Sequence, residues 1–94
     1  MTDQLVKIYK ALADATRIEM VKFLLKNKET SCQEISRKFP LSQPTLSHHF
    51  NKLSGAEILK TRKNGASHYY SINKKLLSSV GINVNRPYLI PSRA

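Results

Sequence analysis

The sequence predicts a mainly α-helical (α+β) domain of four to five short helices with a two-stranded β-hairpin near its end. Apolar residues recur at helical spacing through the first half of the chain. Residues that cap helix N-termini stand just before these stripes. Two β-rich segments then flank Asn64-Gly65, a strong hairpin signal. The 94 residues suffice for one domain, which we assign to residues 1–82, with an irregular C-terminal tail at 83–94.

The first two predicted helices occupy the N-terminal third of the chain. Thr2 or Asp3 is a suitable N-cap for the first helix. Asp14 is a suitable N-cap for the second helix, which should end near Asn27. The expected apolar stripes are Leu5, Ile8, Tyr9 and Leu12 in the first helix and Ile18, Val21, Leu24 and Leu25 in the second.

Two further helices predict a helix-turn-helix at about residues 31–54. Ser31 and Glu34 have the spacing of a capping box, and Thr30 with Gln33 fits that spacing equally well. This third helix should stop before Pro40. Ser42 can cap a fourth helix, whose inner stripe is Leu46, Phe50 and Leu53. In a helix-turn-helix the second helix lies in the major groove of DNA.

A hairpin predicted at about residues 58–72 supplies the wing of a winged helix-turn-helix. With a two-residue turn at Asn64-Gly65, Leu59 pairs with Tyr70 and Lys60 with Tyr69, whereas a longer loop shifts this register. A short last helix should follow, containing Leu76, Leu77 and Val80 and closed by Gly81.

The charge distribution indicates a polyanionic partner. The chain carries 16 Lys and Arg against 6 Asp and Glu, for a net charge of +10. After Glu34 the only acidic residue is Glu57, so the excess of positive charge lies in the second part of the chain. Such a one-sided field suits a nucleic acid.

Candidate contact residues follow from the outer face of the fourth helix and from the hairpin. Gln pairs with adenine edges, and Ser and Thr hydroxyls pair with any base. A basic hairpin can lie along the backbone or enter the minor groove. The candidates are Ser42, Gln43, Thr45, Ser47, His48, Asn51 and Lys52 on the helix and Lys60, Arg62, Lys63 and Asn64 on the wing.

Three segments resemble the ArsR/SmtB family of bacterial and archaeal winged-helix repressors. These segments are Ala11-Leu12-Ala13-Asp14-Ala15-Thr16-Arg17, Leu41-Ser42-Gln43-Pro44-Thr45-Leu46-Ser47-His48-His49-Phe50, and Lys63-Asn64-Gly65 leading to Tyr69-Tyr70. The resemblance implies a sequence-specific double-stranded DNA-binding repressor of a nearby operon. It also implies a homodimer on a pseudo-palindromic operator. The expected dimer interface is Leu5, Ile8, Tyr9, Leu12, Leu76, Leu77 and Val80.

The chain departs from the family where many members bind metals. Ser31 and Gln33 stand where those members have a Cys-x-Cys motif, with Cys32 between them. The segment 73–84 contains no Asp, Glu, His or Cys, so neither family site has its ligands. We therefore expect no metal and no cofactor. Glu57 stands where the family often has Gly, and Gly55 predicts an earlier end of the fourth helix.

Several other interpretations compete with this one. Cys32 is either a redox switch or, as we prefer, a packing residue. An RNA-binding or ribosome-associated winged helix and a protein-interaction module share the predicted fold. An enzyme is disfavoured because no phosphate loop, nucleophile–base pair or paired carboxylates are present. The sequence offers neither a signal peptide nor a long apolar segment, so we expect a cytoplasmic protein without membrane partners.

Overall fold

Capping residues in the sequence set the starts of most helices in the computed structural model, which describes residues 2–82. The expected irregular tail at 83–94 lies outside the described residues. The helices are α1 (Thr2–Leu12), α2 (Ala15–Lys26), α3 (Cys32–Lys38), α4 (Gln43–Gly55) and α5 (Lys74–Ser79).

Three predicted caps are confirmed by their hydrogen bonds. The Asp14 carboxylate accepts from the backbone N–H of Arg17 at 2.9 Å, where α2 begins. Ser31 and Glu34 form the capping box of α3, which decides between the two registers that the sequence left open. The Ser42 hydroxyl accepts from the backbone N–H of Thr45 at 3.3 Å. Each bond satisfies a donor that has no partner inside its helix.

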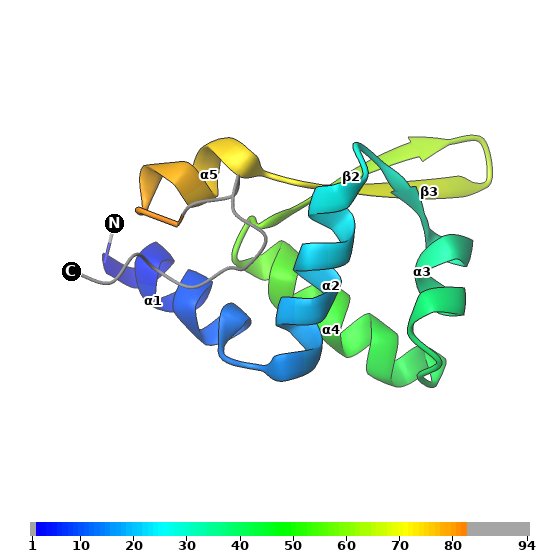
Figure 1. Cartoon of the computed structure of the whole chain (residues 1–94), viewed down its shortest axis with the longest axis horizontal. Helices are drawn as coiled ribbons and strands as arrows, with labels where there is room; N and C mark the ends of the chain where they lie inside the picture. Colours follow the sequence, from blue (N-terminus) through cyan, green and yellow to red (C-terminus); the bar gives the residue numbers. More distant parts are fainter. Residues whose placement is uncertain (1, 83–94) are drawn as a thin grey trace.

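The hydrophobic core lies among the helices, of which α2, α3 and α4 contact the sheet. At one end of the molecule are α1 and α5, and at the other are α3 and the tip of the hairpin (Figure 1). The largest fully buried apolar side chains are Ile8, Met20, Val21, Leu24, Ile35, Leu46, Leu53, Ile58 and Leu77. These residues come from all five helices and the start of the hairpin, so one core holds the described chain together.

The sheet has three antiparallel strands, one more than expected. Besides the hairpin strands β2 (Leu59–Asn64) and β3 (Ser67–Ile72), a short strand β1 (Thr30–Ser31) pairs with β3. The order is β1-β3-β2, so β3 is central. The added strand ties the hairpin to the start of α3.

The expected hairpin register is wrong by two residues. Leu59 pairs with Ile72 rather than Tyr70, and the turn consists of Gly65-Ala66 rather than Asn64-Gly65. Gly65 has a φ of +64°. A type II′ turn has Gly at its first central position, which explains why Gly65 begins the turn. The observed register also places the buried Leu59 and Ile72 opposite each other.

The helix α4 ends at Gly55, and Ala56 is its C-cap. Glu57 follows the cap, at the position where the family often has Gly, so the helix does not end earlier as Gly55 had suggested. The Glu57 N–H donates to the Ser54 carbonyl at 2.9 Å, and the Ile58 N–H donates to the Leu53 carbonyl at 3.0 Å. These two bonds form a Schellman motif. In this motif the residue just after the C-cap adopts a left-handed conformation. Here that residue is Glu57, with a φ of 64°.

The end of α5 uses the same hydrogen bonds with the usual residue. Ile82 donates to the Leu77 carbonyl at 2.9 Å, and Gly81 has a φ of +86°. This confirms the expectation that Gly81 closes the last helix. The same motif has Gly81 at the end of α5 and Glu57 at the end of α4. Only Glu57 is strained, because Gly adopts a positive φ without steric cost.

We predict that Glu57→Gly stabilises the fold. Relief of the left-handed conformation outweighs the added freedom of the unfolded chain, so the free energy of unfolding should rise by about 0.5–1 kcal/mol. Urea unfolding measures this change. Glu57→Ala is the control, because it keeps the strain and removes the side chain that accepts a hydrogen bond from Gln4. A Gly variant no more stable than the Ala variant would contradict the prediction.

Candidate nucleic-acid interface

The turn between α3 and α4, formed by residues 39–42, is anchored on α2. The ring of Phe39 meets the ring of Phe23 edge to face, with 5.9 Å between centroids. The ammonium of Lys38 lies 6.0 Å from the centroid of the same Phe23 ring. These contacts fix the angle at which the chain enters α4.

The α4 helix has one buried face and one polar, exposed face. Leu46, His49 and Leu53 are buried, and Phe50 is half-buried. All the residues that the sequence assigned to DNA contact on this helix or its cap are exposed: Ser42, Gln43, Thr45, Ser47, His48, Asn51 and Lys52. The structure thus groups them on a surface that carries hydrogen-bonding side chains and no carboxylate.

Two of these side chains also have a structural role. The Ser42 hydroxyl accepts from the Thr45 backbone and donates to the Thr45 hydroxyl at 2.9 Å. The cap therefore orients both hydroxyls at the start of α4. The Thr45 hydroxyl proton remains able to donate to a base or a phosphate.

A buried arginine that the sequence analysis did not single out holds α4 in place. The Arg17 guanidinium donates to the Ala11 carbonyl at 2.6 Å and to His49 Nδ1 at 3.2 Å. Because a guanidinium has no acceptor, His49 Nδ1 must accept. Arg17 thereby links the last turn of α1, the start of α2 and the inner face of α4. The only sequence signal was its place in the Ala11–Arg17 segment.

Asp14 completes this cluster. Its carboxylate lies 3.9 Å from His49 Nδ1. The hydrogen bond from the Arg17 backbone lowers the pKa of Asp14 below its ordinary value, and the nearby guanidinium adds to the effect. His49 has a structural role in α4, because its ring accepts a hydrogen bond from the buried Arg17 guanidinium.

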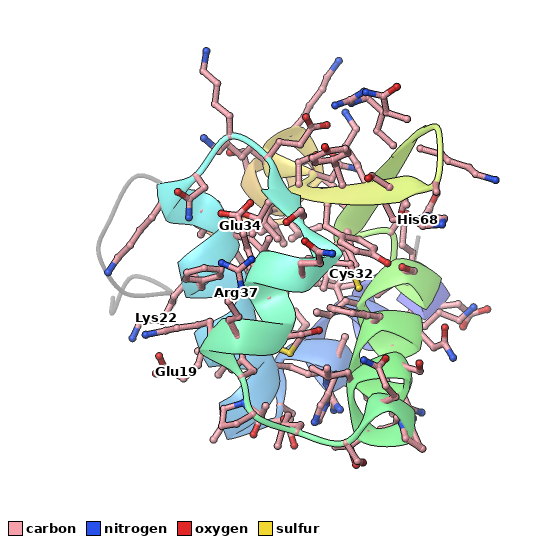
Figure 2. All side chains as sticks on the ribbon, turned by 90° about the vertical axis from the view of Figure 1, so that its right-hand side faces the viewer. Glu19, Lys22, Cys32, Glu34, Arg37 and His68 are labelled. Carbon is pink, nitrogen blue, oxygen red and sulfur yellow. The ribbon has the colours of Figure 1, made fainter. Side chains whose placement is uncertain are left out.

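The hairpin is coupled to α4 by aromatic stacking. The rings of Phe50 and Tyr70 stack with 4.8 Å between centroids and an angle of 19°. Side chains alternate along a strand, so Lys63 and its partner His68 lie on the same face of the hairpin as Tyr70. Figure 2 shows His68 on the hairpin, on the same side of the molecule as α4.

Arg62, predicted to contact DNA, is held by protein contacts on the opposite face of the hairpin. Its Nε and Nη2 atoms donate to the Glu29 carboxylate at 2.7 and 2.9 Å. Its guanidinium also lies 4.8 Å from the centroid of the Tyr69 ring. Arg62 is exposed, as are Lys60, Lys63 and Asn64, but its guanidinium is already engaged by the Glu29 carboxylate.

The predicted dimer residues divide into three groups. Leu5 and Tyr9 are 36% and 44% exposed, whereas Leu12, Leu76 and Val80 are half-buried. Ile8 and Leu77 are fully buried within the chain, which corrects their assignment to an interface. They are buried because other elements of the chain pack over them in the core. Val6, at 44% exposure, was missed.

Few other groups in the described part of the chain could carry a function. Cys32 is a free, half-buried thiol at the first residue of α3 (Figure 2). Within residues 2–82, no group of three or more His, Cys, Asp and Glu side chains is arranged to hold a metal ion. No helix in this range is long and apolar enough to span a membrane.

The Glu29–Arg62 pair yields a pH prediction. The hydrogen bonds from Arg62 hold the pKa of Glu29 below its ordinary value. A carboxyl whose pKa is lower in the folded state stabilises that state above its unfolded pKa, and the benefit is lost as the pH falls through the folded pKa. Titration followed by NMR should show a lowered pKa that returns toward the ordinary value in Arg62→Gln. An unchanged pKa in that variant would show that the pair does not persist in solution.

Comparison with known proteins places this architecture in a family. Residues 14–61 match the family described as bacterial regulatory protein, arsR family. The arsenical resistance operon repressor of Staphylococcus aureus is 37% identical over 82 residues, which cover 87% of this chain and 78% of that protein. The transcriptional repressor SdpR of Bacillus subtilis is 36% identical over 70 residues, covering 74% of this chain and 77% of SdpR.

The solved structures agree with the sequence comparisons. HlyU from Vibrio cholerae N16961 superposes with a TM-score of 0.73 at 29% identity, and the match covers 84% of this chain and 85% of HlyU. A three-stranded sheet with a projecting hairpin, set behind a helix-turn-helix, is the winged-helix arrangement. The chain belongs to the ArsR family and is a winged helix-turn-helix regulator of transcription that binds DNA.

Proposed function

We propose that this regulator represses transcription by binding as a homodimer to a pseudo-palindromic operator. In this proposal α4 enters the major groove and the β2–β3 hairpin follows the neighbouring sugar-phosphate backbone. The observation that carries the proposal is the polar face of α4, which is fully exposed above a buried apolar stripe. Such a face can read base edges only if nothing in the protein covers it.

The packing of the aromatic side chains favours duplex DNA over RNA. Readers of single-stranded RNA present aromatic rings on which bases stack. Here Tyr70 stacks on Phe50, and Tyr69 lies under the Arg62 guanidinium. These half-buried rings are engaged by other side chains of the protein, while the hydrogen-bonding side chains of α4 are exposed. A protein-interaction module is less well supported, because the outer face of α4 has no acidic residue.

Repression is supported by the relatives. Two of them carry the word repressor in their names, and one is named for an arsenical resistance operon. We infer that this chain likewise represses a nearby operon and acts in the cytoplasm, where its target DNA lies. We propose no metal effector, because the positions at which many family members bind metals carry other residues here.

The homodimer is supported by the exposed apolar face of α1. Leu5, Val6 and Tyr9 are 36–44% exposed and lie near one another on α1. Half-buried Leu76 and Val80 of α5 lie at the same end of the molecule (Figure 1). A second copy would remove this surface from water. Two copies would then present their α4 helices to successive half-sites about 34 Å apart.

The central prediction concerns Gln43. Gln43→Ala should cost about 1–3 kcal/mol of binding free energy at particular bases and leave other positions unchanged. The readout is selection of bound sites from random duplex DNA, done in parallel with the unmodified protein. Equal sequence preference in both selections would exclude α4 as the reading helix.

A lysine pair provides the matched comparison for that experiment. Lys63→Ala should weaken binding to all sequences alike and lower the slope of log affinity against log salt by about one. Lys26→Ala removes the same charge at the end of α2, far along the chain from the predicted contacts, and should leave the slope unchanged. Equal effects of the two changes would mean that only the overall charge attracts DNA.

The dimer is tested on α1. Leu5→Glu places a charge in the proposed interface, so sedimentation equilibrium should show a shift from dimer toward monomer. Leu41→Glu is the control, because Leu41 is 37% exposed but lies in the turn before α4. A Leu5→Glu variant that sediments as the unmodified protein does would place the interface elsewhere.

A further inference from the structure

A pocket of about 330 Å³ lies between α1 and the second half of α4. Lys7 and Lys10 line it from α1, Arg17 from α2, and Asn51 and Lys52 from α4. No acidic residue contributes to its lining. Its volume is at the lower end of the range for small-molecule sites, so it can hold a group larger than a water cluster.

Arg17 gives this pocket a buried positive charge that has no direct ion pair among the described residues. The residue is only 9% exposed, and the partners of its side chain are uncharged: two backbone carbonyls and His49 Nδ1. Within residues 2–82 no carboxylate lies within 4.0 Å of its guanidinium. Asp14, the nearby acid, accepts from the backbone of Arg17 instead. The Asp14 carboxylate is near enough to interact with the Arg17 charge but makes no direct ion pair with it, and an anion in the pocket would further offset the cost of burying the guanidinium.

We propose that this pocket binds an oxyanion, the phosphate or carboxylate group of its ligand. The exposed Lys7 and Lys10 supply positive charge, and the N–H groups of the Arg17 guanidinium that have no partner within residues 2–82 can donate to an oxygen. Asn51 adds an amide that can donate to an oxygen of the same group. Gly55, another lining residue, leaves open space, since a Cβ there would meet no atom within 4 Å.

The oxyanion can come from a free small molecule or from the DNA backbone. Asn51 and Lys52 belong both to the pocket and to the exposed face of α4. A small anion bound there would therefore compete with DNA and act as an effector. A backbone phosphate bound there would instead add to DNA affinity. The link to DNA rests on the proposed function, whereas binding of an anion by the free protein does not.

The first test uses the free protein and inorganic phosphate at constant ionic strength. Phosphate should produce saturable NMR shifts of backbone amides in α1 and α4. Lys7→Gln/Lys10→Gln should weaken the binding by about tenfold or more. Lys26→Gln/Lys28→Gln, which removes equal charge at the far end of α2, should leave it unchanged. Shifts that do not saturate, or equal losses in the two double variants, would show an adventitious ion only and overturn the proposal.

The second test separates the two sources of the anion. The salt dependence of duplex binding is compared between the unmodified protein and Lys7→Gln/Lys10→Gln. A slope lower by about two identifies the occupant as a DNA phosphate. An unchanged slope, together with competition between adenosine monophosphate and DNA, identifies a small-molecule site. Because the phosphate titration contains no DNA, it can succeed even if the proposed repressor function fails.

Discussion

The buried contact between Arg17 and His49 is the constraint on which the position of α4 depends. The guanidinium joins α1, α2 and α4 through hydrogen bonds of 2.6 Å to the Ala11 carbonyl and 3.2 Å to the His49 ring. A helix packed only by Leu46 and Leu53 can roll by small angles on an apolar surface. A directed polar contact permits one orientation, and this orientation presents the polar face of α4 to the outside.

The position of the hairpin also depends on α4, through stacked aromatic rings. Phe50 of α4 stacks on Tyr70, the central strand β3 carries Tyr70, and β1 ties that strand to the start of α3. Glu29 and Arg62 then clamp the opposite face of the hairpin. Contacts within the chain therefore hold α4 and the hairpin in one arrangement.

Local signals in the sequence were sufficient for the helices and for the exposed face of α4. Caps at Asp14, Ser31 and Ser42 act through hydrogen bonds to residues three positions away, so their effect is visible in a short window. Tertiary contacts were not visible in this way. The hairpin register depends on burying Leu59 against Ile72, and the engagement of Arg62 depends on Glu29, which is distant in sequence. The burial of Ile8 and Leu77 likewise depends on which helices meet in the core.

The burial of Arg17 was not predicted for the same reason. Sequence patterns assign charged residues to the surface, because a buried charge is costly unless it is hydrogen-bonded. Here the carbonyls at the end of α1 and the ring of His49 supply the partners, and only the fold brings them together. The left-handed Glu57 is a related case, since the position demands a conformation that its residue type disfavours.

A double-mutant cycle on Arg17 and His49 tests this account most directly. The free energy of unfolding is measured by urea denaturation for Arg17→Met, His49→Leu and the double variant. If Arg17 holds α4 through His49, the two changes should be non-additive, with a coupling of about 1 kcal/mol. Additive losses would mean that the contact does not hold the helix, and the account of how α4 is positioned would be wrong.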